Sequence, residues 1–275
     1  MVRRKPTDDR ARVQSVEIGH QVLDCLARKG KATSLTDLAN SLGVSTSKVH
    51  RYLVSLIRCG LVEQDDLTSN YDLGPAALSL GLLALGRLDY HHHGQVYARR
   101  LRDAVNLNVS LSVWRERGPV IVTWLDVGQP IEVAGRIGSS LSPIRSNAGR
   151  VFLAYRSERE INDVFAQAYS RRRPPTNEGQ ALTRKSFHVL LADVRERRLA
   201  RVLGDYTPGI DSLSAPVFDS AGNVVLALSL IGQHGTFDVA WDGPIAKALS
   251  TTAAELSARL GFVDTAGAAG NAADA

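Results

Sequence analysis

One sequence feature restricts the fold of this chain more than any other. It is a pair of short predicted helices, joined by a glycine-containing turn and followed directly by a predicted strand hairpin. Apolar residues at helical spacing predict helices over 35–42 and 45–58, with Gly43 between them as a left-handed stop. Ser45 is the expected N-cap of the second helix. The alternating runs 60–64 and 70–74, separated by polar residues 65–69, predict a hairpin. The sequence therefore predicts a winged helix-turn-helix.

Positive charge is concentrated in the same region. Residues 1–60 carry 11 Lys and Arg against 5 Asp and Glu, whereas the rest of the chain carries 22 against 23. A basic head on a neutral body is typical of a DNA-reading domain attached to a domain with another task. The alternative is a nucleoid-type protein that binds any duplex, which a large neutral body does not favour.

One face of the helix over 45–58 is apolar, with Val49, Leu53, Leu56 and Ile57 expected to point inward. The opposite face and the hairpin tip offer side chains suited to phosphate oxygens and base edges. These candidate DNA-binding residues are Ser45, Thr46, Ser47, Lys48, His50, Arg51 and Ser55 on the helix, and Thr68, Ser69 and Asn70 on the wing. Lys48 and Arg51 are the strongest candidates for phosphate or guanine. An ordinary amphipathic helix with a solvated face is the alternative.

The organisation of the whole chain follows from this head. We expect a flexible basic arm over 1–12, the winged helix-turn-helix over 13–75, a linker and dimerisation helix over 76–95, a second domain over 96–264 and a disordered tail over 265–275. The helix that begins at Pro75 is mostly apolar, so we expect it to pack against a partner subunit, with coverage by its own chain as the alternative. Mixed helices and antiparallel strands after residue 96 predict an α+β sensor-like domain.

Several other functions find no support in the sequence. No long apolar segment or secretory signal is present, so we expect a cytoplasmic protein with no membrane partner and with Cys25 and Cys59 as free thiols. Three adjacent histidines, 91–93, cannot all ligate one ion from a helix, so we expect no metal. No catalytic or cofactor-binding motif occurs, and the chain is expected to be neither an enzyme nor a cofactor carrier.

Short motifs in order along the chain resemble the IclR family of bacterial transcriptional regulators. The head carries VQSVE at 13–17, SLTDLA at 34–39, SKVHRYL at 47–53, GLVE at 60–63 and YDLG at 71–74, and the body carries GRVFLA at 149–154, PGI at 208–210, APVFD at 215–219 and ALS at 227–229. The resemblance implies a homodimer or a dimer of dimers on a palindromic operator. It also implies a GAF-like C-terminal domain that binds a small organic effector, and thus a ligand-responsive repressor or activator of metabolic genes.

The resemblance also places the effector site. The matching positions form a glycine-containing loop, a helix start and two late strands, and they are Gly138, Ser139, Ser146, Asn147, Ala148, Ile210, Ser212 and Ser229. Exposed backbone N–H groups with nearby hydroxyls can hold a carboxylate without a metal. Relatives that bind small keto acids carry an acidic residue where this chain has Val202 and a serine where it has Ile231. We therefore expect a more apolar pocket and an acid with an aromatic or alkyl body. Trp114, Trp124 and Trp241 are expected in the core or an interface, with the pocket mouth as the alternative.

Overall fold

The computed structural model describes residues 13–86, 89–116, 118–128, 136–169, 176, 177 and 179–264. The chain divides between Leu88 and Asp89 into two compact units, and each unit is described by itself. The predicted basic arm, residues 1–12, and the predicted tail, residues 265–275, lie outside the described residues. Among the described residues, no helix is both long enough and apolar enough to cross a membrane.

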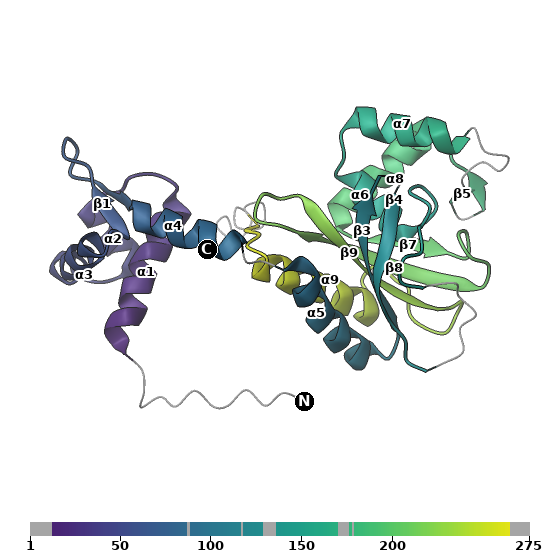
Figure 1. The fold of residues 1–275 in the computed structure, drawn as a ribbon, viewed down its shortest axis with the longest axis horizontal. Helices are drawn as coiled ribbons and strands as arrows, with labels where there is room; N and C mark the ends of the chain where they lie inside the picture. The colour runs from purple at the N-terminus through teal and green to yellow at the C-terminus, as the bar shows by residue number, and fades with distance from the viewer. Residues whose placement is uncertain are drawn as a thin grey trace. The chain divides into compact units, whose positions relative to one another are not determined.

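The first unit contains the predicted winged helix-turn-helix (Figure 1). Its elements are α1 (Gln14–Lys29), α2 (Leu35–Leu42), α3 (Thr46–Arg58), β1 (Val62–Gln64), β2 (Tyr71–Leu73) and α4 (Pro75–Gly86). The Ser34 hydroxyl accepts the Asp37 N–H and so caps α2, and Gly43 ends that helix at a φ of 63°. Strands β1 and β2 pair antiparallel to form the wing.

A small apolar core holds the first unit together. Its fully buried members come from α1, α2, α3 and the wing, and they are Val22, Leu26, Leu38, Ala39, Val49, Leu53, Val62 and Tyr71. Leu56 packs against the edge of this core. Ile57, which was also expected to point inward, is 37% exposed. That expectation was wrong, because the buried face of α3 does not extend to Ile57 although the apolar spacing does.

The boundary between the units differs from the predicted linker. Helix α4 ends at Gly86, and α5 (Tyr90–Val105) begins before residue 96, where the second domain was expected to start. The physical reason is a cap, since the Asp89 carboxylate accepts the His92 N–H at 2.9 Å and starts a new helix. The expected single linker helix over 76–95 is therefore interrupted, and its last residues belong to the second unit.

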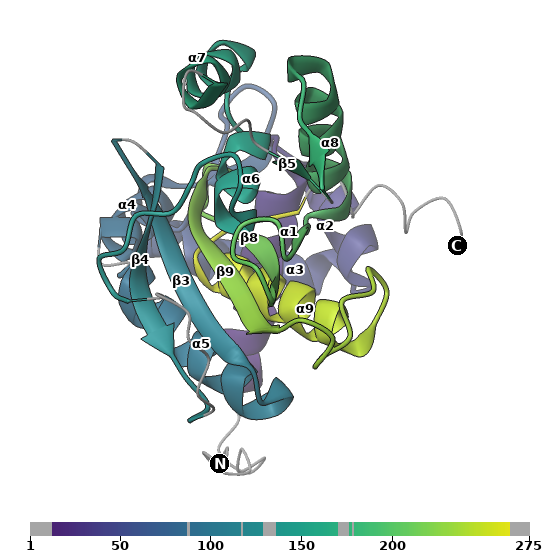
Figure 2. The same cartoon turned by 90° about the vertical axis from the view of Figure 1, so that its right-hand side faces the viewer.

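The second unit is an α+β domain built on one antiparallel sheet (Figure 2). The strand order is β4-β3-β9-β8-β7, and every neighbouring pair is antiparallel. After α5 its elements are β3 (Asn108–Arg115), β4 (Gly118–Leu125), α6 (Asn147–Ala154), α7 (Glu158–Tyr169), β5 (Thr176–Asn177), β6 (Gln180–Ala181), α8 (Arg184–Arg197), β7 (Ala200–Leu203), β8 (Ile210–Phe218), β9 (Val224–Gln233) and α9 (Pro244–Arg259).

Helices cover both faces of this sheet. Helices α5 and α9 lie side by side on one face, and α6 and α8 lie on the other (Figures 1 and 2). The core on the α6 side includes Ile144, Phe152 and Phe187. Gly149 lets α6 approach the preceding loop, because an added Cβ would overlap the Pro143 carbonyl. This close approach fixes the start of α6 over the sheet.

Candidate functional site

Helix α3 presents its polar face outward. Val49 and Leu53 are fully buried beneath it. Of the candidate DNA-binding residues on this helix, Lys48 is half-buried and the exposed ones are Ser45, Thr46, Ser47, His50, Arg51 and Ser55. Ser45 occupies the N-cap position, but its side chain makes no capping hydrogen bond. Its hydroxyl is therefore not used for the helix cap that the sequence predicted.

The wing tip is a rigid and acidic turn. One Asp65 carboxylate oxygen accepts the Leu67 N–H at 3.1 Å, the Thr68 N–H at 2.6 Å and the Thr68 hydroxyl at 2.8 Å. The Thr68 backbone bond, followed by its hydroxyl bond, lowers the pKa of Asp65 from its ordinary value. Because the Thr68 proton is used inside the turn, Ser69 and Asn70 are better placed than Thr68 to donate to a phosphate.

The second unit contains a cavity of about 620 Å³ between the sheet and the start of α6. Its lining residues are Ser110, Ile121, Trp124, Ser139, Ser140, Leu141, Ser146, Asn147, Tyr206, Thr207, Ile210, Ser212, Ser229 and Ile231. None of these side chains is a carboxylate or a basic group. Among the described residues, no cluster of His, Cys, Asp and Glu could hold a metal ion.

Six of the eight predicted effector positions line this cavity, and two do not. Those that do are Ser139, Ser146, Asn147, Ile210, Ser212 and Ser229. Gly138 is exposed, and its N–H donates to the Ile121 carbonyl at 2.8 Å. Ala148 belongs to α6 and is fully buried in the core on that side of the sheet. Neither residue lines the cavity.

Strand pairing explains why residues that were not predicted, such as Ser110 and Trp124, line the cavity. Ser110 pairs directly with Ser229 on one side and with Trp124 on the other, so all three side chains share one face of the sheet. The Ser229 hydroxyl also lies 2.9 Å from that of buried Ser214. The expectation that Trp124 lies in the core or an interface was wrong, since it lines the cavity. The only available signal was the register, which a single sequence does not show.

Val202 and Ile231, the two positions at which this chain departs from relatives that bind small keto acids, lie in different places. Ile231 lines the cavity beside Ser212, with which it pairs directly. Val202 is buried in β7 and does not line it. The apolar part of the wall is formed by Ile231 together with Ile121, Trp124, Leu141 and Ile210.

The start of α6 brings hydrogen-bond donors to the cavity. The Ser146 hydroxyl accepts the Gly149 N–H at 3.1 Å and so caps the helix. Asn147 is only 6% exposed, and its Oδ1 accepts the Ala148 N–H at 2.9 Å. Its Nδ2 is buried without a hydrogen-bond partner among the described residues. An unpartnered buried donor beside a helix N-terminus favours a ligand that brings an acceptor oxygen.

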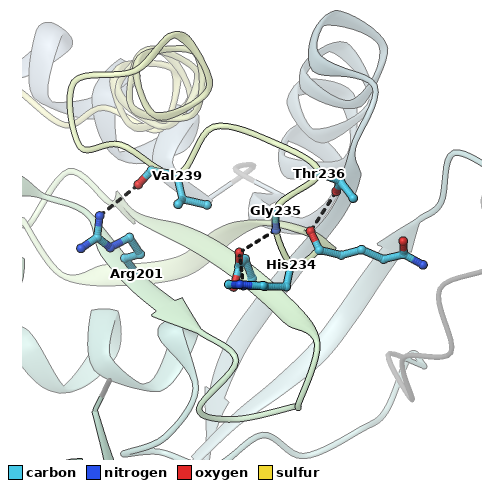
Figure 3. Close-up of polar contacts among 7 residues, drawn as sticks. Arg201, His234, Gly235, Thr236 and Val239 are labelled. Carbon is cyan, nitrogen blue, oxygen red and sulfur yellow. Dashed lines mark hydrogen bonds and ion pairs between the residues drawn. The ribbon is translucent and has the colours of Figure 1, made fainter. Parts of the chain in front are cut away.

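Polar contacts join the loop after β9 to the neighbouring strands (Figure 3). His234 Nδ1 lies 3.0 Å from both carboxylate oxygens of Asp211, which is buried in β8 between two lining residues. The Arg201 guanidinium donates to the Val239 carbonyl at 3.2 Å and stacks on Trp241, with 4.4 Å to the ring centroid. These contacts tie the loop after β9 to β7 and β8 and hold the cavity strands in place.

A winged helix-turn-helix unit followed by an α+β unit with an internal cavity defines the class of DNA-binding transcriptional regulators. Two family models match the chain: the IclR helix-turn-helix domain over residues 15–66 and the bacterial transcriptional regulator IclR C-terminal domain over residues 82–258. The chain belongs to the IclR family of bacterial transcriptional regulators, as its motifs predicted.

Individual relatives agree with this assignment. The chain is similar to the crystal structure of Pseudomonas aeruginosa HmgR, with 35% identity and a TM-score of 0.82 over 92% of this chain and all of that one. It is 25% identical to the HTH-type transcriptional regulator XynR of Escherichia coli over 91% of this chain and 98% of XynR. It is also 28% identical to the glycerol operon regulatory protein of Streptomyces coelicolor, over 80% and 85% of the two chains. The relatives are regulators of transcription, and this chain is a regulator and not an enzyme.

Proposed function

We propose that this protein is a ligand-responsive regulator of metabolic genes that reads a specific operator with α3 and binds a small organic acid in the cavity. Two observations together carry the proposal: α3 has an outward polar face, and the cavity has a buried donor, Asn147 Nδ2, that lacks an acceptor among the described residues. An effector changes DNA binding only by binding one arrangement of the protein more tightly than another. Such a regulator acts in the cytoplasm, beside the chromosome.

The cavity wall supports an acid with an aromatic or alkyl body as the effector. The N-terminus of α6 and the Asn147 amide suit a carboxylate at one end of the cavity. Trp124 and the neighbouring aliphatic side chains suit an apolar body. A cavity of about 620 Å³ lies in the range that encloses molecules larger than a two- or three-carbon keto acid.

Helix α4 supports assembly into a homodimer or a dimer of dimers. Its exposed leucines are Leu78, Leu80, Leu82 and Leu83, which are 58–65% exposed in the single chain. An apolar surface of this kind is normally covered by a partner. We propose a second copy of α4 as that partner, which places two α3 helices on two half-sites of one operator.

Replacement of Arg51 tests the DNA-reading part of this proposal. Arg51→Ala is expected to weaken operator binding by about 5- to 150-fold, because a bidentate or phosphate contact contributes about 1–3 kcal/mol. If the contact is to phosphate, the slope of log affinity against log salt also falls by about 1. Fluorescence anisotropy with a labelled operator, selected from genomic fragments, measures both quantities.

Arg28→Ala is the matched control, because Arg28 lies on α1 in an ion pair with Asp24 at 2.9 Å. It removes the same charge from the same unit and should leave operator affinity within about twofold. Equal affinity of wild type and Arg51→Ala would contradict the placement of the reading helix. Equal affinity of the wild type for any duplex would instead indicate a non-specific DNA-binding protein.

Titration with a panel of organic acids tests the cavity. Aromatic and alkyl carboxylates should bind in calorimetry, and Asn147→Ala should weaken that binding by about tenfold, the effect of one lost charge-assisted hydrogen bond. Tight binding confined to glyoxylate or pyruvate would contradict the apolar pocket.

A further inference from the structure

We propose that Arg145, which does not line the cavity, supplies the positive charge that selects an anionic ligand and transmits its binding to the segment 204–209. This inference rests on the proposed function, because it assigns a role within the same cavity. We call residues 204–209, between β7 and β8, the strap. Tyr206 and Thr207 of the strap form part of the cavity wall.

Arg145 is positioned between the helix start and the strap. It directly precedes Ser146, the N-cap of α6, and it is half-buried. Its Nη2 donates to the Asp205 carbonyl at 2.6 Å, and its guanidinium lies 5.9 Å from the centroid of the Tyr206 ring. A single side chain thus contacts two successive strap residues.

One nitrogen of the Arg145 guanidinium lacks an acceptor among the described residues. Its Nε is buried and has no hydrogen-bond partner among the described residues. Within the same part of the chain, no carboxylate forms an ion pair with it. A buried charged donor without an acceptor is energetically unfavourable. Binding of an anion beside it is therefore more favourable than binding beside a neutral donor. Because none of the described lining side chains carries a formal charge, none of them neutralises this guanidinium.

The strap itself is held at both ends and at its centre. Gly204 and Gly209 bound it with φ angles of 68° and 78°, a conformation that glycine adopts without strain. The Tyr206 hydroxyl accepts the Ser142 N–H at 3.2 Å, which leaves the Tyr206 proton to donate toward the cavity. The Asp205 carboxylate accepts the Gly179 N–H at 2.9 Å, which links the strap to the β5–β6 turn.

These contacts define how an anion is sensed. A carboxylate at the start of α6 accepts from Asn147 Nδ2 and Tyr206, and it attracts the guanidinium of Arg145. Because Nη2 of Arg145 holds the Asp205 carbonyl, the strap is drawn against the cavity when the anion binds. The strap carries that change to the β5–β6 turn through Asp205. A neutral ligand of the same shape fills the cavity without this effect.

Naphthoate and its neutral amide, naphthamide, separate charge from shape. The full-length wild-type protein, Arg145→Gln, Arg145→Lys and Arg159→Gln are titrated with each probe by fluorescence, and strap mobility is followed by hydrogen exchange. Arg159 is exposed on α7, so its replacement is the charge-matched control. We expect Arg145→Gln to weaken naphthoate binding about tenfold or more and naphthamide binding less than about twofold. Naphthoate should slow exchange in residues 204–209 of the wild type and of Arg159→Gln, but not of Arg145→Gln.

Arg145→Lys keeps the charge but loses the planar fork, so it should recover part of the naphthoate affinity and little of the strap protection. This variant also gives an answer if Arg145→Gln does not fold. An equal loss of affinity for naphthoate and naphthamide in the Arg145 variants would overturn the inference and assign Arg145 a purely structural role. Unchanged naphthoate binding in Arg145→Gln would also overturn it while leaving the cavity as the effector site. Binding of neither probe by the wild type would contradict the proposed function, and with it this inference.

Discussion

The buried guanidinium of Arg150 allows a stability effect to be worked out from the structure. Arg150 has no exposed surface, although it is a charged residue. Its Nε and its two terminal nitrogens donate to four oxygens over 2.6–3.2 Å, and these acceptors are the backbone carbonyls of Ile144, Thr176 and Arg201 and the side-chain Oδ1 of Asn177. One side chain therefore joins α6 to the loop before it, to β5 and to β7.

Arg150→Met keeps most of the side-chain volume but removes these four bonds to described residues. Each buried carbonyl left without a donor costs about 1–3 kcal/mol, so three carbonyls set a range of about 3–9 kcal/mol. Thr176 and Asn177 are only half-buried and can turn toward water, which moves the expected loss to about 3–5 kcal/mol. For a unit of this length, that loss lowers Tm by about 6–20 °C.

Tryptophan fluorescence isolates the relevant unit in a urea or thermal denaturation. All three tryptophans of the chain, at positions 114, 124 and 241, belong to the second unit. Arg159→Met on exposed α7 is the matched control and should change stability by no more than about 0.5 kcal/mol. If Arg150→Met also stayed within about 0.5 kcal/mol of the wild type, the buried hydrogen bonds would contribute nothing net and the reasoning would be refuted.

Three further outcomes are expected from separate features of the fold. Gly149→Ala should destabilise the second unit by about 1–3 kcal/mol in the same denaturation, because its Cβ would overlap the backbone of Pro143; a gain in stability would contradict that contact. The lowered pKa of Asp65 means that its bond to Thr68 stabilises the wing turn above the ordinary aspartate value of 3.8 and is lost as pH falls through the lower folded value, which amide NMR shifts of the turn should follow. Leu82→Glu should prevent the proposed dimerisation through α4 in sedimentation at micromolar concentration, and unchanged assembly would exclude α4 as the subunit interface.

The head could be predicted from the sequence because its signals are local. Gly43 and the Ser34 cap act within a few residues of themselves, and the apolar spacing of α3 identifies Val49 and Leu53 as core. The predictions differed from the structure where contacts with residues distant in the sequence determine the position of a side chain. Ile57 has apolar spacing but is 37% exposed, and Ser45 holds the expected N-cap position without a side-chain capping bond.

The cavity was predictable only in part, and only through the family resemblance. Three of the positions that the resemblance suggested, Ser139, Asn147 and Ser229, line the cavity, because a motif keeps its position in the fold. Nothing in one sequence indicates that Trp124 faces Ser229 across an intervening strand, since that depends on the register of three strands. The strap was missed for a similar reason, because Tyr206 reaches the cavity through a loop whose path depends on distant contacts.

The sequence alone determined the order of helices, the winged head, the excess of positive charge there and the family. Each of these depends on residues a few positions apart or on composition, which folding does not alter. Tertiary structure decided which side chains enclose the cavity, and it left Asn147 Nδ2 and Arg145 Nε among the buried groups without acceptors in the described part of the chain. Hydrogen-bond satisfaction is a property of groups brought together from distant parts of the chain, so it exists only once the chain has folded.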